Sequence, residues 1–228
     1  GGIAVPLNIV SPASEIQREL DTVQPRIVFV EPAAMTAWSS VDRSSLTELR
    51  AVIATEGHDI AGAITLTESL MHAPVPILNM TPSEVAVFIF TSGTAGSPKA
   101  AMLTHNNLHS NLVQISHENV LRSSDVVYGV LPLFHIFGLN VVLGYTLFVG
   151  ATVVLVQRFD PSTALETFAE RGVTVVPGAP QVWSALAQMP DDECKVLSQL
   201  RVALTGAAKM PEQVTNQLKD RFGLIVHE

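Results

Sequence analysis

The feature that most constrains the fold is an alternation of short apolar runs with longer amphipathic segments along the chain. The apolar runs are typical of buried strands, and the amphipathic segments are typical of helices that cover them. This spacing predicts an α/β fold with mostly parallel sheets flanked by helices. Ser11 or Ser14 is expected to cap the first helix, and Gly172 and Gly223 to end two later ones. Strands are predicted over residues 2–7, 26–30, 49–54, 84–90, 100–103, 125–131, 152–156, 173–176, 200–204 and 224–226, and helices over residues 12–23, 32–38, 65–71, 105–117, 137–148, 161–171, 181–188 and 211–222.

Charge and cysteine content narrow the partners and the compartment. A formal net charge of −8 disfavours nonspecific binding to nucleic acid, which needs a basic surface. The single Cys194 excludes an internal disulfide framework. Because residues 1–6 carry no signal-peptide pattern either, a cytoplasmic location is expected. A length of 228 residues allows one large domain or two smaller ones.

One long segment, Val126–Gln157, contains no Asp, Glu, Lys or Arg. A run of about 20 apolar residues is long enough to cross a bilayer. Pro132, Gly138 and Asn140 interrupt this run, and a parallel sheet covered by helices also produces uncharged segments. We therefore predict a buried core and no transmembrane span, and leave peripheral membrane contact open.

A second segment, Phe90–His105, carries the clearest chemical pattern. Lys99 is its only Asp, Glu, Lys or Arg, and it follows a run of hydroxyl side chains and glycines. One cation beside hydroxyl and backbone N–H donors suits a cluster of phosphate oxygens, although a solvated turn has a similar composition. Pro98 precedes the lysine and Ala100 follows it, so the segment is neither a Walker loop nor a dinucleotide-binding fingerprint.

The order of these residues resembles the signature of the adenylate-forming superfamily, which includes acyl-CoA synthetases, luciferases and peptide-synthetase adenylation domains. Phe90–Lys99 matches its pattern, an aromatic residue followed by Thr-Ser-Gly-Thr-Thr-Gly-x-Pro-Lys-Gly, and residues 102–105 continue the match with Met-Leu-Thr-His. Two positions depart from it, Ala95 where Thr is usual and Ala100 where Gly is usual. The first departure removes one hydroxyl that would contact phosphate.

Two further segments match the superfamily in the expected order. Residues 131–138, Leu-Pro-Leu-Phe-His-Ile-Phe-Gly, resemble a second signature in which the histidine and a nearby aromatic residue line the pocket for the carboxylate substrate. Residues 205–208, Thr-Gly-Ala-Ala, resemble a loop that contacts adenine and the acyl group. All three segments follow predicted strands, and ligands of open α/β sheets bind at the carboxyl ends of strands.

The resemblance implies a two-step reaction with ATP, Mg²⁺ and coenzyme A as co-substrate. A carboxylate would attack the α-phosphorus of ATP, and a thiol would then displace AMP from the acyl adenylate. By this resemblance His135 is the catalytic residue near the carboxylate, and Thr91 also contacts Mg²⁺. The residues that would bind the nucleotide are Thr91, Ser92, Gly93, Thr94, Ala95, Gly96, Ser97, Lys99, Gly206, Ala207 and Ala208.

The resemblance also predicts what kind of piece the chain is. The motifs that follow in the superfamily, among them an acidic Mg²⁺ ligand and a small domain with a catalytic lysine, are absent after Glu228. We expect an incomplete N-terminal domain, inactive alone, with one subdomain over about residues 1–80 and a second over about residues 81–228.

The substrate class can be narrowed in the same way. Amino-acid-activating members usually carry an acidic residue near the second signature, and Val126–Gln157 has none. An unpaired buried ammonium group would be costly, so a fatty or aryl acid is favoured, and our hypothesis is a fatty-acid–CoA ligase. Two alternatives stay open: transfer of the acyl group to a carrier protein, and a noncatalytic nucleotide-binding module.

Overall fold

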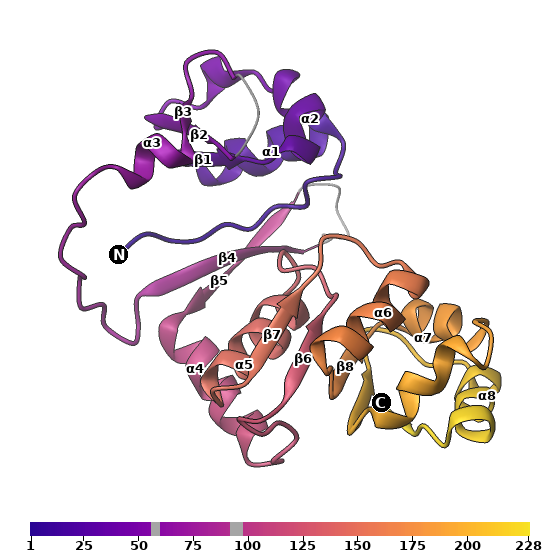
Figure 1. Cartoon of the computed structure of the whole chain (residues 1–228). Helices are drawn as coiled ribbons and strands as arrows, with labels where there is room; N and C mark the ends of the chain where they lie inside the picture. The colour runs from indigo at the N-terminus through magenta and orange to yellow at the C-terminus, as the bar shows by residue number, and fades with distance from the viewer. Residues whose placement is uncertain (56–59, 92–97) are drawn as a thin grey trace. The chain divides into compact units, whose positions relative to one another are not determined.

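The computed structural model describes residues 1–55, 60–91 and 98–228 of the chain (Figure 1). The chain divides into two compact units, Gly1–Asn106 and Asn107–Glu228, and each is described by itself below. The subdomain boundary expected near residue 80 stays a prediction.

The first unit contains a small parallel sheet with the strand order β1-β2-β3. Apolar side chains of β1 and β2 that point to one face form a core with the helices α1 and α2. Trp38 and Leu20 are its largest buried members. The elements are α1 (Ala13–Val23), β1 (Ile27–Val30), η1 (Pro32–Ala34), α2 (Met35–Ser39), η2 (Arg43–Ser45), β2 (Ala51–Ala54), β3 (Ile64–Thr65) and α3 (Leu66–Leu70).

A two-stranded hairpin of β4 (Val85–Thr91) and β5 (Lys99–Thr104) completes this unit. The strands pair antiparallel, with Thr91 opposite Lys99 and Ile89 opposite Ala101. The sequence predicted both extended segments but not their pairing, which departs from the otherwise parallel sheets. Because of this pairing, the two ends of the segment from Thr91 to Lys99 lie next to each other.

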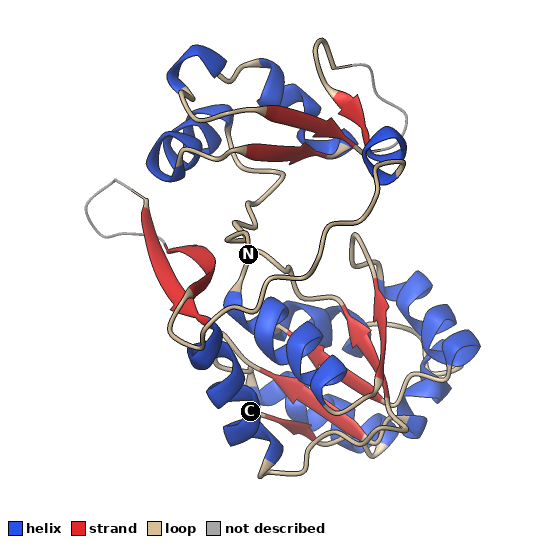
Figure 2. Cartoon of the chain, turned by 90° about the vertical axis from the view of Figure 1, so that its left-hand side faces the viewer, coloured by secondary structure: helices blue, strands red, loops and turns tan. Residues whose placement is uncertain are grey.

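The second unit is built on a five-stranded sheet with the order β10-β9-β8-β6-β7, in which every pairing is parallel. Helices lie on both of its faces (Figure 2). The elements are α4 (His105–Ser116, which begins at the end of the first unit), β6 (Val126–Gly129), η3 (Phe137–Gly144), α5 (Tyr145–Phe148), β7 (Thr152–Leu155), α6 (Pro161–Arg171), β8 (Val175–Gly178), α7 (Pro180–Ala187), η4 (Glu193–Gln199), β9 (Val202–Thr205), α8 (Glu212–Phe222) and β10 (Val226–His227).

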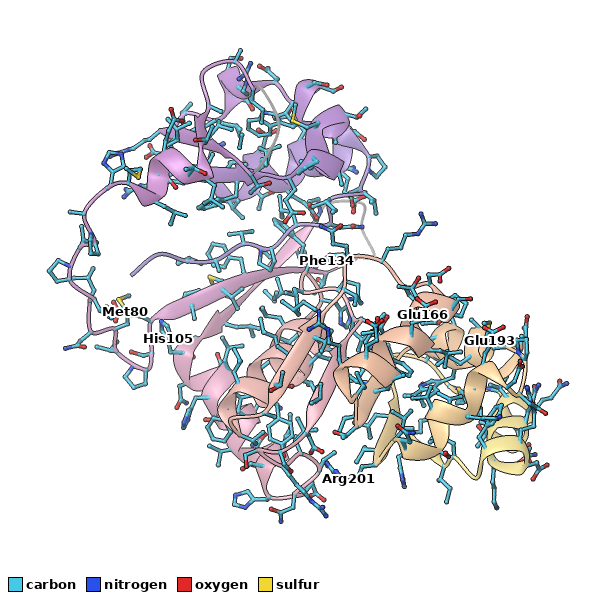
Figure 3. The ribbon with its side chains drawn as sticks, in the orientation of Figure 1. Met80, His105, Phe134, Glu166, Glu193 and Arg201 are labelled. Carbon is cyan, nitrogen blue, oxygen red and sulfur yellow. The ribbon has the colours of Figure 1, made fainter. Side chains whose placement is uncertain are left out.

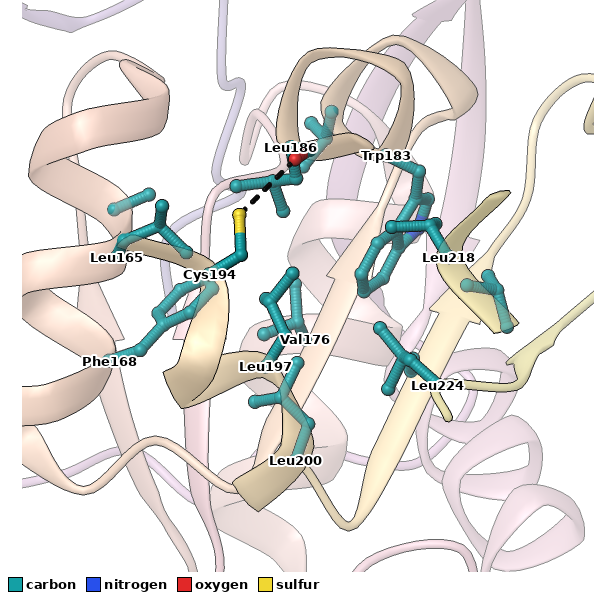
Figure 4. Close-up of a cluster of buried hydrophobic side chains, with 14 of the residues drawn as sticks. Leu165, Phe168, Val176, Trp183, Leu186, Cys194, Leu197, Leu200, Leu218 and Leu224 are labelled. Atoms are coloured by element: carbon teal, nitrogen blue, oxygen red, sulfur yellow. Dashed lines mark hydrogen bonds between the residues drawn. The ribbon is translucent and has the colours of Figure 1, made fainter. Parts of the chain in front are cut away.

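Alternate side chains of these strands enter two different cores, as the period of two along a strand requires. Tyr128, Val176 and Ala203 face a large cluster with side chains of α6, α7, η4 and α8, part of which is drawn in Figure 4. Val127 and Val175 face the opposite side, where they pack with side chains that include Val142 of η3. Strands β6 and β8 are therefore covered on both faces, as predicted, whereas the edge strand β7 exposes Thr152 and Leu155.

The run Val126–Gln157 forms β6, η3, α5 and β7. Among the described residues, no helix has the length and apolar character needed to cross a bilayer. Val127, Tyr128 and Val142 of this segment lie in the buried cores, whereas Leu147 and Leu155 are exposed.

Several local predictions differ from the structure. Residues 2–7 form only an isolated bridge between Ala4 and Val87, because no neighbouring strand continues the pairing. The cap prediction for α1 is wrong: its N-cap residue is Pro12, and no side chain caps it. Gly172 and Gly223 do end their helices, with φ angles of 61° and 65° that glycine adopts without strain.

Candidate functional site

The mouth of the β4–β5 hairpin holds the first two predicted site residues. Thr91 and Lys99 are direct partners in the antiparallel pairing, and both are exposed. The Thr91 hydroxyl donates a long hydrogen bond of 3.4 Å to the carbonyl oxygen of Lys99. Paired residues project to the same face of a hairpin, so a hydroxyl and an ammonium group are presented together. The other predicted residues of this loop, Ser92, Gly93, Thr94, Ala95, Gly96 and Ser97, lie outside the described residues.

The second site segment is a tight turn after β6. The backbone N–H of His135 donates to the carbonyl of Pro132 at 3.2 Å, and Leu139 N–H donates to the carbonyl of His135 at 2.9 Å. A Cβ at Gly138 would lie 2.1 Å from the Pro132 carbonyl oxygen, so this position requires glycine. The turn holds His135 between a strand end and the start of η3, where its side chain is exposed (Figure 3 labels the neighbouring Phe134).

The imidazole of His135 has a defined orientation. Its Nδ1 accepts a hydrogen bond of 3.2 Å from the backbone N–H of Phe137. A neutral imidazole that accepts at Nδ1 carries its proton on Nε2. The exposed end of the ring is therefore a hydrogen-bond donor, the group needed beside a carboxylate or phosphate oxygen.

The helix after this turn has a feature that the sequence did not predict. Residues 137–144 form a π-helix, a rare geometry that often occurs at functional sites. Asn140 is buried within it, and its side-chain amide donates to Asn111 Oδ1 at 2.8 Å and to the Leu108 carbonyl at 3.4 Å. These bonds tie η3 to α4. The only sequence signal was an amide in an otherwise apolar run.

The third segment follows β9 and meets the second. A Cβ at Gly206 would come within 2.9 Å of the Phe137 ring, so the two segments are in contact. Ala207 has a φ of 69°, a left-handed conformation that is unusual for a residue with a Cβ. The structure thus brings Phe137, two residues after His135, against Gly206, the first residue of the loop after β9.

Other features of the described residues bear on ligands. A hollow of about 300 Å³ lies beside β9 and β10 and is lined by none of the predicted site residues. No group of three or more His, Cys, Asp or Glu side chains that could hold a metal ion occurs among residues 1–55, 60–91 and 98–228. The Thr91 hydroxyl is nonetheless a hard oxygen donor, the type that Mg²⁺ takes when it binds with nucleotide phosphates.

Comparison with known proteins assigns the family. A sequence model described as AMP-binding enzyme matches residues 1–228. The chain belongs to the AMP-binding enzyme family. This AMP-binding enzyme is 36% identical to 4-coumarate–CoA ligase 1 of Solanum tuberosum over 152 residues, which span 65% of the chain and 28% of the ligase. Feruloyl-CoA synthase of an Amycolatopsis species is 38% identical over 146 residues, spanning 64% of the chain and 30% of the synthase.

Solved structures share the fold of this AMP-binding enzyme. ATP-bound MatB from Rhodopseudomonas palustris matches with a TM-score of 0.81 and 24% identity, over 100% of this chain and 45% of MatB. A putative long-chain-fatty-acid CoA ligase from the same organism matches with a TM-score of 0.84 and 21% identity, over 99% of this chain and 55% of that chain. The AMP-binding enzyme chain therefore spans about half the length of these structures, and the predicted superfamily and fold class are confirmed.

Proposed function

We propose that the full-length protein activates an apolar carboxylic acid with ATP and transfers the acyl group to coenzyme A. The observation that carries this proposal is the contact between Phe137 and Gly206 beside the exposed, oriented imidazole of His135. Family membership and the similarity to 4-coumarate–CoA ligase and feruloyl-CoA synthase support it.

In the first step a carboxylate oxygen attacks the α-phosphorus of ATP and pyrophosphate leaves. Two anions approach each other, so the protein contributes mainly positioning and neutralisation of charge. We assign the Nε2–H donor of His135 to the reacting carboxylate and phosphate oxygens. Lys99 and Thr91, with the loop between them, bind the β- and γ-phosphates, and Gly206–Ala208 bind the adenine. Bound Mg²⁺ would neutralise phosphate charge, and the Thr91 hydroxyl would be a ligand that this chain offers it.

The acid is assigned as apolar for a physical reason. Val126–Gln157, which carries the second signature, contains no carboxylate that could pair with the ammonium group of an amino acid. The sequence favoured a fatty or aryl acid, with a fatty acid as our hypothesis, and the names of the relatives, which contain 4-coumarate and feruloyl, support an aryl acid.

The deciding experiment is ATP–pyrophosphate exchange by the full-length protein with a panel of acids. The panel contains fatty acids of increasing length, 4-coumarate, ferulate and, as a control, an apolar amino acid. We expect exchange with a fatty or aryl acid and none with the amino acid. A second assay supplies either coenzyme A or an acyl carrier protein and identifies the acceptor. ATP binding without exchange for any acid would contradict the proposal and favour a noncatalytic nucleotide-binding module.

A further inference from the structure

Strand β9, which leads into the loop Gly206–Ala208, accepts a hydrogen bond from one buried aromatic residue that no signature includes. We propose that Trp183 of α7 is a positioning residue for the nucleotide-binding loop Gly206–Ala208. It acts through the carbonyl group of Leu204, two residues before the loop. This inference rests on the function proposed above, because it takes that loop as the adenine site.

The contact is a directed hydrogen bond from a fixed donor. The indole Nε1–H of Trp183 donates to the Leu204 carbonyl oxygen at 3.0 Å. The side chain of Trp183 is completely buried, in the cluster drawn in Figure 4. A buried indole N–H without a partner is unfavourable, so the bond ties α7 to the end of β9.

The start of α7 lies close to the end of β8. This close approach fixes the position of the Trp183 indole. Gly178 ends β8 and is the register partner of Thr205 at the end of β9. A Cβ at Gly178 would lie 3.1 Å from Val182 Cβ and 3.2 Å from Trp183 Nε1. Glycine therefore leaves the room in which the indole reaches the neighbouring strand.

The loop itself needs such external support. Ala207 is held in a left-handed conformation, which is unfavourable for a residue with a Cβ. The buried hydroxyl of Thr205 makes no hydrogen bond to any part of the chain that the structure describes. The Phe137 ring lies against Gly206, and the Trp183 indole holds Leu204. One aromatic side chain thus contacts the first residue of the loop, and a second, from another element, contacts the backbone of β9 two residues before it.

A purely structural role for Trp183 makes a different prediction. If the indole only fills the core, its replacement lowers stability and leaves the affinity for ATP unchanged. If it positions the loop, its replacement raises the KM for ATP more than the KM for the acid. The KM for ATP in the exchange assay therefore separates the two roles.

The test compares Trp183→Phe with Phe168→Leu in the full-length protein. Phe keeps an aromatic ring and removes the N–H donor. Phe168 is equally buried in the same cluster and lies on α6, so its variant controls for lost packing. We expect Trp183→Phe to raise the KM for ATP roughly three- to tenfold, the size of one hydrogen bond, and Phe168→Leu to leave it unchanged. Equal effects of both variants, or none, would overturn the proposal.

A second variant tests the proposal if Trp183→Phe does not fold. Gly178→Ala crowds the indole without altering it and is expected to raise the KM for ATP in the same way. Calorimetry with AMP gives a readout that does not depend on turnover. If no acid supports exchange, the proposed function fails, but weaker AMP binding by Trp183→Phe would still support the positioning role. Unchanged AMP binding by both variants would refute it.

Discussion

The ring of Phe137 lies against the backbone of Gly206, so that a Cβ at Gly206 would come within 2.9 Å of Phe137 Cε1. This contact joins the turn after β6 to the loop after β9. The same residue, Phe137, donates its backbone N–H to the imidazole of His135. The backbone of Phe137 therefore orients the proposed catalytic imidazole, and its side chain restricts the space available to the proposed nucleotide-binding loop.

The first prediction concerns this contact. Gly206→Ala is expected to lower ATP–pyrophosphate exchange about tenfold, because the new methyl group must displace the ring or the loop. Phe137→Leu in the same chain removes the ring edge, so the double variant is expected to be more active than Gly206→Ala alone. Exchange rates of the two single variants and the double variant form a cycle that measures the coupling. Additive effects would show that the two residues act independently.

The second prediction uses the two nitrogens of His135. The side-chain amide nitrogen of Gln can take the position of the histidine Nε2, and that of Asn can take the position of Nδ1. Because Nδ1 serves the Phe137 backbone and Nε2 faces outward, His135→Gln should retain more exchange activity than His135→Asn. His135→Ala should lose about 10²-fold, as the loss of one donor to a developing charge does. The order of these rates is the measurement, and the reverse order for Gln and Asn would contradict the assigned tautomer.

The third prediction tests the cation of the hairpin. Lys99→Ala should lower exchange by about 10²-fold or more, because a positive charge beside the phosphates is lost. Lys195→Ala is the matched control, since it removes the same charge from an exposed position on η4. Equal exchange activity of the two variants would contradict the assignment of Lys99 to the phosphate site.

The positions of these site residues could be predicted from the sequence because they depend on local patterns. Apolar runs followed by glycine, proline and hydroxyl residues indicate a strand and then a loop, and the structure has β4, β6 and β9 before the three signature segments. The carboxyl ends of parallel strands meet at one edge of a sheet, which is why loops distant in the sequence were expected to be neighbours. The contact of Phe137 with Gly206 agrees with this expectation, and the shared site of His135 and Gly206 stays a prediction.

Contacts that depend on packing between distant elements could not be predicted. In the sequence, Trp183 is recognisable only as part of an apolar helix face. Its hydrogen bond to Leu204 depends on which strands are neighbours in the sheet. Within the π-helix the amide of Asn140 donates to Asn111, a pairing that no periodicity in the sequence reveals. The antiparallel pairing of β4 with β5, which follow each other along the chain, was also not predicted.

The fourth prediction concerns a buried ion pair at the beginning of β6. Asp125 accepts hydrogen bonds from Arg201, from Thr174 and from the backbone N–H of Arg122 (Arg201 is labelled in Figure 3). Burial alone would raise the pKa of Asp125, but these bonds, Arg201 first, outweigh it and hold the pKa below its ordinary value of 3.8. The stability that they supply is therefore present above pH 3.8 and is lost as the pH falls through the lower folded-state pKa.

Asp125→Asn is expected to lower the free energy of unfolding by about 2 kcal/mol at pH 7, because the buried Asp125 carboxylate loses its charge-assisted hydrogen bonds with the partly exposed Arg201. The gap to the wild type should narrow as the pH falls below about 4. Asp191→Asn is the control, because Asp191 pairs with Arg221 while 78% exposed and should cost under about 1 kcal/mol. Urea unfolding across the pH range measures the free energy of unfolding of both variants. Equal losses of stability would show that burial does not strengthen the Asp125 pair.

The fifth prediction starts from a buried carboxylate oxygen that has no hydrogen-bond partner among the described residues. Glu19 on α1 is 6% exposed, and its Oε2 makes no hydrogen bond to the described residues. Burial, and then the nearby charge of Glu15, raise its pKa from 4.5 to about 7, against the opposing charge of Arg18. The folded state thus prefers the protonated form, and this preference is fully present below pH 4.5 and is lost as the pH rises through 7.

Glu19→Gln should therefore be more stable than the wild type at pH 8, because the amide carries no charge to bury. One pKa unit corresponds to about 1.4 kcal/mol, so the shift from 4.5 to about 7 sets an upper limit of about 3 kcal/mol on the gain. The gain should disappear near pH 4.5, where the wild-type carboxyl is neutral when folded. Glu48→Gln, an exposed control, should change stability little at either pH. Thermal unfolding at pH 4.5 and pH 8 gives the answer, and a gain equal at both values would mean that charge burial is not its cause.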